Sequence, residues 1–143
     1  MADGQLKVRL VTPDRILVDQ TADAVEVPGK SGYIEVLYGH APLLSAIGAG
    51  EVRLHGGEAG GGSESAQRYS VARGFVEVLP DRVTILAETA EKPEEIDTGA
   101  AQEQLQHGHQ LWNEAGEDPE KYKHANEVIA EAEAKLASAA GKA

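Results

Sequence analysis

The residue pattern of the chain changes once, at Glu88, and this change limits what the chain can fold into. Before Glu88, short apolar runs alternate with polar residues and are separated by glycine and proline. From Pro93 onward, alanine, glutamate, glutamine and lysine dominate, and β-branched runs almost disappear. The first pattern is typical of strands and the second of helices. We therefore expect an all-β domain over residues 1–90 and a helical part over residues 91–143.

The N-terminal part contains many short strand patterns joined by turn residues. Leu6, Val8 and Leu10 alternate with Lys7 and Arg9, which is the period-two pattern of a half-buried strand. Further strands are expected over residues 16–18, 24–27, 32–37, 43–47, 51–54, 67–72, 75–79 and 82–87, with a break at Gly74 and a glycine-rich loop over 55–65. This spacing predicts a β-sandwich, a flattened barrel of short antiparallel strands. Because aromatic residues are few, its core is expected to be aliphatic.

The C-terminal part carries two apolar stripes at helical spacing. The first contains Ala101, Leu105, Gly108, Trp112 and Ala115, and the second contains Tyr122, Ala125, Ile129, Ala132, Leu136 and Ala139. Gly116 suits the position after a helix, and Asp118 followed by Pro119 suits the start of the next. We expect an antiparallel two-helix hairpin. Since its stripes are narrow and rich in alanine, we expect the hairpin to be weakly held.

Composition excludes several classes of function. The chain has no cysteine, so disulfides and thiolate metal sites are not available. A net charge of -11 argues against nucleic acid and against direct docking on anionic lipid. The start of the chain has no leader pattern, and no apolar run approaches the roughly 20 residues that span a bilayer. We expect the chain to meet a membrane only through a partner.

No group of residues in the sequence predicts catalysis or a metal site. Pro28-Gly29-Lys30-Ser31 resembles the end of a phosphate-binding loop, but the preceding glycine is missing and a strand follows, so a β-turn is the better interpretation. His107 and His109 lie two apart on an expected helix and point to different faces, which favours solvated side chains. No nucleophile is paired with a base. We expect a protein that is not an enzyme and has no cofactor.

His40 stands in a corner between two apolar runs. The simplest interpretation is a side chain that hydrogen-bonds the backbone of its own corner, and this is preferred to catalysis. Contact with a partner protein is a third interpretation.

The corner Gly39-His40-Ala41-Pro42-Leu43-Leu44 and the return Gly48-Ala49-Gly50-Glu51 resemble the epsilon subunit of bacterial F-type ATP synthase. The resemblance extends through residues 6–19, the strand end 25–29, residues 71–78 and residues 83–90, and so covers nearly the whole chain. The family architecture, a β-sandwich followed by a two-helix hairpin, agrees with the pattern above.

The resemblance implies a non-catalytic rotor subunit at the foot of the central stalk of a proton-translocating ATP synthase. In the family, one side of the sandwich binds the gamma subunit and its lower end binds the loops of the c-ring. Carried over by position, the turn Gly29, Lys30, Ser31, Gly32 and Tyr33 would meet the c-ring, and the corner His40, Ala41 and Pro42 would lie near gamma. The implied location is the cytoplasmic face of the bacterial inner (plasma) membrane, as a peripheral protein.

In the family the hairpin can extend toward the alpha and beta subunits and inhibit ATP hydrolysis, and in some members it binds ATP through an Ile/Leu-Asp-x-x-Arg-Ala motif. Here Ile96, Asp97 and Ala101 match this motif, but Ala100 stands in the arginine position. We therefore expect ATP binding to be weak or absent. From Pro93 onward the only basic residues besides histidine are four lysines among many glutamates, so inhibition is expected to be mild or steric.

Two other functions stay open at this point. One is a regulatory module that senses ATP through its hairpin, against which Ala100 counts. The other is a free-standing β-sandwich adaptor, which would have no affinity for a gamma subunit.

Overall fold

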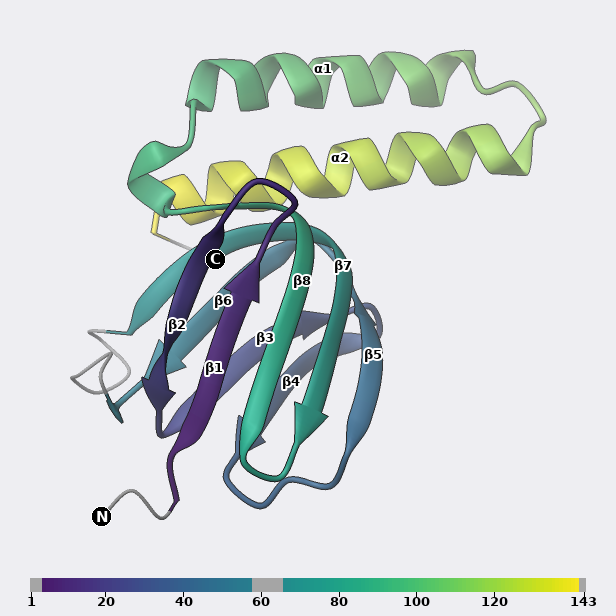
Figure 1. The fold of residues 1–143 in the computed structure, drawn as a ribbon. Coiled ribbons are helices and arrows are strands. Elements are labelled where there is room, and N and C mark those ends of the chain that lie inside the picture. The colour runs from purple at the N-terminus through teal and green to yellow at the C-terminus, as the bar shows by residue number, and fades with distance from the viewer. Residues whose placement is uncertain (1–3, 58–65, 142–143) are drawn as a thin grey trace. The chain divides into compact units, whose positions relative to one another are not determined.

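The computed structural model describes residues 4–57 and 66–141. The chain divides into two compact units, Met1–Lys92 and Pro93–Ala143. The first unit is built of strands and the second contains the helices (Figure 1). Most of the loop expected over residues 55–65 lies outside the described residues. Within the described part of the chain, no helix is long and apolar enough to cross a membrane.

The described residues of the first unit form eight strands. They are β1 (Leu6–Val11), β2 (Ile16–Ala22), β3 (Ala24–Gly29), β4 (Gly32–Leu37), β5 (Leu43–Ile47), β6 (Gly50–His55), β7 (Gln67–Leu79) and β8 (Arg82–Glu91). The sheet order is β2-β1-β8-β7-β5-β3-β4, and β6 pairs with β3 and β7. The strands fold into two layers, which confirms the predicted β-sandwich (Figure 1). The pair β1–β8 is parallel, whereas the other strand pairs are antiparallel.

The core follows the alternation in the sequence. Leu6, Val8 and Leu10 have no exposed side-chain surface, and they pack with valines, leucines and isoleucines of the other strands. Tyr69 is the aromatic residue within this cluster. The expected aliphatic core is confirmed.

Strand β2 is longer than its apolar residues suggest. The strand expected over residues 16–18 is confirmed, but β2 continues beyond it to Ala22. Its polar second half pairs with β1 up to the partners Leu6 and Ala22. Backbone pairing with a neighbouring strand therefore extends β2 beyond its apolar run.

Strand β7 passes through the position where a break was expected. Gln67–Val71 pairs with β6, and Gly74–Val78 pairs with β5, so β7 joins the two layers. The direction changes at Arg73, whose φ is 54°, and Gly74, whose φ is 140°. A Cβ atom at Gly74 would collide with the backbone carbonyl oxygen of Leu86 on β8. Gly74 therefore bends the strand and lets β8 approach closely, and it does not end the strand.

The second unit begins with a short 3₁₀ turn, η3 (Pro93–Glu95), and continues with α1 (Thr98–Glu114) and α2 (Pro119–Ala139). Asp97 caps α1 by accepting a hydrogen bond from the Ala100 N–H, and Asp118 caps α2 in the same way from Glu120. Gly116, with φ of 63°, follows the C-cap of α1. The predicted hairpin and the cap at Asp118-Pro119 are confirmed.

The two helices meet along small side chains. Ala101 and Gly108 of α1 and Ala125 and Ala132 of α2 are buried. A Cβ atom at Gly108 would lie 2.7 Å from Cγ1 of Ile129, so the two helices lie close together at this position, where α1 has no side chain. How weakly this hairpin is held stays a prediction.

The end of the hairpin near the connecting loop is held by aromatic contacts. Trp112 and Tyr122 pack edge to face with ring centroids 4.6 Å apart. The Tyr122 hydroxyl donates a hydrogen bond to the Gly116 carbonyl oxygen over 2.8 Å. These contacts tie the start of α2 to the end of α1.

We expect Gly74→Ala to lower the free energy of unfolding by about 3 kcal/mol, because the new methyl group adds a steric collision to backbone strain. The control is Gly39→Ala, whose φ is also positive at 88° but whose Cβ would meet nothing within 4 Å. That control is expected to cost about 1 kcal/mol. Urea unfolding followed by far-ultraviolet circular dichroism measures both, and equal losses would contradict this account of Gly74.

We expect Gly108→Ala to loosen the hairpin. Overpacking costs about 1–3 kcal/mol, which outweighs a gain of about 1 kcal/mol in helix propensity. Gly99→Ala is the control, since at this exposed site in the first turn of α1 the added Cβ would meet only the Asp97 side chain, at 3.3 Å, and no atom of α2. Amide hydrogen exchange along α1 should become faster in the first variant and slower in the second. Slower exchange in both would show that the contact at Gly108 is not tight.

Candidate partner interface

Apolar side chains form a continuous row across the outer face of one layer of the sandwich. Its members are paired residues on five neighbouring strands. In order across β5, β7, β8, β1 and β2 they are Ala46, Phe75, Leu86, Val11 and Ile16. Leu44 lies two residues before Ala46 on the same face of β5. We call these six residues the apolar band. Its width corresponds to four strand spacings, or about 19 Å.

The large side chains of the band are exposed in a way that folding alone does not explain. The exposed fractions are 70% for Leu44, 56% for Phe75, 52% for Ile16 and 51% for Leu86. Single exposed apolar residues are ordinary, but a contiguous exposed row marks an interaction surface. The band is therefore the strongest candidate for a protein interface in this unit.

Ion pairs border the band on both sides. On one side, Nε of Arg73 lies 2.6 Å from Oε2 of Glu88. On the other side, Nε of Arg9 lies 4.0 Å from Oδ2 of Asp19. An apolar centre with a charged rim is the usual composition of a protein–protein contact.

The apolar band is not predicted by the sequence pattern. One signal for it is present in the sequence. Adjacent residues of a strand point to opposite faces, so an apolar residue next to a core residue must point outward, as Phe75 does beside buried Val76. This signal identifies single exposed residues. Whether such residues from different strands lie side by side depends on the pairing register, which the signal does not give.

The predicted partner turn Gly29–Tyr33 is a tight turn between β3 and β4. Gly32 adopts a φ of 136°, and the Lys30 N–H donates a hydrogen bond to the Ala46 carbonyl oxygen. A strand follows the turn, so the interpretation as a β-turn and not a phosphate loop is confirmed. Lys30 and Ser31 are exposed, and 51% of the Tyr33 side chain is accessible.

The predicted partner corner His40-Ala41-Pro42 lies at the opposite end of β5 from this turn. Nδ1 of His40 donates a hydrogen bond to the Ala41 carbonyl oxygen over 2.6 Å, which is the local backbone contact expected for His40. The Gly39 N–H donates to the Pro80 carbonyl oxygen, so the corner is attached to the β7–β8 turn. Leu44 of the apolar band follows Pro42 by two residues. The corner therefore adjoins the band, and the turn Gly29–Tyr33 is separate from the corner.

A cluster of charged side chains occupies the outer face of β3, β6 and β7. The Glu51 side chain is buried and accepts hydrogen bonds from Nε of Arg53 at 3.0 Å and from Nε of Arg68 at 3.0 Å. Nη1 of Arg53 also reaches Glu26 at 3.4 Å, and Nε2 of His55 lies 2.7 Å from Glu26. Burial disfavours the charged form of Arg53, but the contacts with Glu51, Tyr33 and Glu26 outweigh burial and raise the pKa of Arg53.

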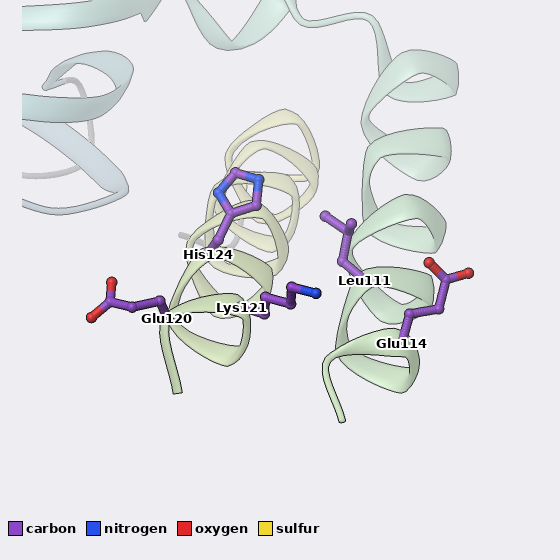
Figure 2. A pocket seen from close by; sticks show the side chains of 5 residues that line it. All are labelled: Leu111, Glu114, Glu120, Lys121 and His124. Carbon is purple, nitrogen blue, oxygen red and sulfur yellow. The ribbon is translucent and has the colours of Figure 1, made fainter. Parts of the chain in front are cut away.

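The hairpin contains a hollow of about 340 Å³ near its connecting loop. It is lined by Leu111, Glu114, Glu120, Lys121 and His124. Figure 2 shows Lys121 extending toward α1 and Leu111 toward α2, whereas the carboxylates of Glu114 and Glu120 point away from the space between the helices. The polar groups do not converge on one point, as a small-molecule site requires. The described residues also contain no group of three side chains arranged to hold a metal.

The three residues of the degenerate nucleotide motif do not form a site together. The Asp97 carboxylate is engaged as the N-cap of α1, with the Ala100 N–H 3.0 Å from Oδ1. Ala101 is buried, and Ile96 is half-buried. Asp97 thus starts the helix, and Ala101 is buried in its first turns.

The chain is similar to proteins of one family in sequence. Residues 5–93 match the family described as ATP synthase, Delta/Epsilon chain, beta-sandwich domain. The ATP synthase epsilon chain of Koribacter versatilis is 42% identical over 118 residues, which are 81% of this chain and 77% of the relative. The epsilon chain of Solibacter usitatus is 40% identical over 136 residues, or 94% of this chain and 95% of the relative.

A solved structure has the same fold. A chain in the Euglena gracilis mitochondrial ATP synthase, determined as an OSCP/F1/c-ring assembly, superposes with a TM-score of 0.74. The match covers 93% of this chain and 80% of that chain, at 20% identity. At this identity the match concerns the fold alone.

Proposed function

The chain belongs to the ATP synthase delta/epsilon family, and from this premise we propose how its surfaces serve the central stalk. It is a non-catalytic epsilon-type chain of ATP synthase, a peripheral membrane assembly that transports protons. Our proposal is that the sandwich couples rotation of the c-ring to the gamma subunit and the catalytic head. We place this function at the cytoplasmic face of a bacterial plasma membrane.

The gamma subunit is proposed to cover the apolar band. The observation that carries this proposal is the exposed row of Phe75, Leu86 and Ile16 with an ion-pair rim. A subunit that transmits torque needs a contact that resists shear, and a broad apolar contact on a rigid sheet meets that need better than one loop does. The corner His40-Ala41-Pro42 would extend the same contact, because it leads directly into Leu44.

The c-ring is proposed to meet the turn Gly29–Tyr33. Its exposed Lys30 and half-exposed Tyr33 offer a cation and an aromatic edge. The turn and the corner lie at opposite ends of β5, so the sandwich can bind two partners at once. This separation is what a coupling subunit requires.

The hairpin is proposed to act as a mild inhibitor of ATP hydrolysis through contact with the alpha and beta subunits. Residues 93–143 contain 11 acidic residues and 4 lysines, so charge does not favour contact with an acidic surface. Because charge does not favour this contact, the proposed mode of inhibition is steric insertion of the hairpin. The alternative of an ATP-sensing module is disfavoured because the Asp97 carboxylate caps α1 and Ala100 carries no charge.

We expect Leu86→Glu to weaken binding to a gamma subunit roughly tenfold or more, because a charge would be buried at the centre of the contact. Leu37→Glu is a matched control, since Leu37 is 52% exposed on β4, outside the band. Titration against a catalytic head stripped of its own epsilon chain measures both affinities. Equal weakening would place the contact elsewhere, and no binding by the unchanged chain would favour the free-standing adaptor.

In the same reconstituted head, we expect the full chain to slow ATP hydrolysis more than a chain ending at Lys92, because only the full chain carries the hairpin. Both forms should co-elute with gamma. Equal hydrolysis rates would show that this hairpin does not inhibit.

We expect millimolar ATP to give no binding heat in calorimetry with the full chain. Ala100→Arg restores a guanidinium at the position where relatives of the nucleotide-binding type carry one, and it should increase any affinity. A micromolar dissociation constant for the unchanged chain would contradict this prediction and favour the ATP-sensing alternative.

A further inference from the structure

The Tyr33 side chain does not project freely from the turn that carries it. Although 51% of it is exposed, its hydroxyl oxygen accepts a hydrogen bond from the Glu51 N–H on β6 over 2.9 Å. The guanidinium of Arg53 lies over its ring, 5.5 Å from the centroid. One edge of the ring is thus held on the sheet while the rest stays accessible.

Gly50 provides the space in which the Tyr33 hydroxyl lies. A Cβ atom at Gly50 would be 2.8 Å from that hydroxyl and 2.7 Å from Cβ of Pro28. The φ of Gly50 is not in the left-handed region, so its backbone conformation does not require glycine. Close packing of Tyr33 and Pro28 is the reason that a glycine fits this position.

Arg53 is held over the ring by carboxylates on both sides. Its Nε donates to Oε1 of Glu51 over 3.0 Å, and its Nη1 donates to Oε2 of Glu26 over 3.4 Å. Glu51 is itself fixed by Arg68, whose Nη2 lies 2.5 Å from Oε2. Only 22% of the Arg53 side chain is exposed. The guanidinium therefore has a defined position above Tyr33.

We propose that Gly50 and Arg53 are positioning residues that hold Tyr33 in the orientation in which the turn Gly29–Tyr33 meets its partner. This inference rests on the proposed function, in which that turn binds the c-ring. A side chain that is already ordered loses less conformational freedom on binding. Gly50 and Arg53 therefore raise the affinity for the partner without contacting it. The freedom of one large side chain corresponds to about a three- to tenfold change in affinity.

The experiment measures binding of the full-length chain to purified c-ring in detergent micelles. We expect Tyr33→Ala to weaken binding, and Gly50→Ala and Arg53→Gln each to weaken it about three- to tenfold. Gly108→Ala is the matched control, because it adds the same methyl group with a similar 2.7 Å clash in the other unit, and it should leave affinity unchanged. Arg53→Gln keeps the inference testable if Gly50→Ala does not fold.

A double-mutant cycle separates positioning from a general effect on the fold. In a Tyr33→Ala background, Gly50→Ala and Arg53→Gln should have no further effect on affinity. In chains with labelled tyrosine, the NMR signals of the Tyr33 ring should shift in the Gly50 and Arg53 variants while those of buried Tyr69 stay in place.

The outcomes that overturn the inference are distinct. If Tyr33→Ala leaves c-ring binding unchanged, Tyr33 is not part of the contact and the inference is wrong; if the unchanged chain does not bind the c-ring, the proposed function of the turn is wrong. If Tyr33→Ala weakens binding but the Gly50 and Arg53 variants bind normally, the turn is the contact and the positioning role alone is wrong. The positioning role is also wrong if Gly50→Ala weakens c-ring binding equally in the unchanged chain and in the Tyr33→Ala background.

Discussion

The close approach of β7 and β8 at Gly74 is the constraint on which the sandwich depends. Strand β7 pairs with β6 before this point and with β5 after it, so the two layers share one continuous strand. The change of direction requires a positive φ at Arg73 and Gly74, and it requires space against the Leu86 carbonyl. A glycine satisfies both conditions at position 74, and Arg73 is a residue other than glycine that adopts a positive φ here.

The same bend determines where large apolar side chains reach the outer surface of the sandwich. Beyond Gly74, the outward positions of β7 and β8 are Phe75 and Leu86, and the register continues this row onto β1 and β2. The apolar band therefore passes directly beside the bend, and the Arg73–Glu88 ion pair borders it there. Because the band belongs to paired strands and not to a mobile loop, a partner bound there would be held at a fixed orientation.

The helical unit is built on a different principle. Its helices approach through alanine and glycine, so little apolar surface is buried per residue, and aromatic packing is confined to the end near the connecting loop. Its acidic residues lie mostly on exposed positions. These features suit a unit whose contacts with other subunits depend on shape more than on charge, in line with the proposed mild inhibition.

Local residue order was enough to predict the two-part architecture, the aliphatic core, the helix caps at Asp118 and Pro119, and the turn chemistry at residues 29–32. Each of these depends on neighbours within a few residues, or on the periodicity of one element. Tertiary structure decided the length of β2, the passage of β7 through Gly74, the apolar band and the contacts that hold Tyr33. Their partners lie far apart in the chain, as Val11 and Leu86 or Tyr33 and Glu51 do. Pairing register brings such residues together, and periodicity carries no information about register between distant strands.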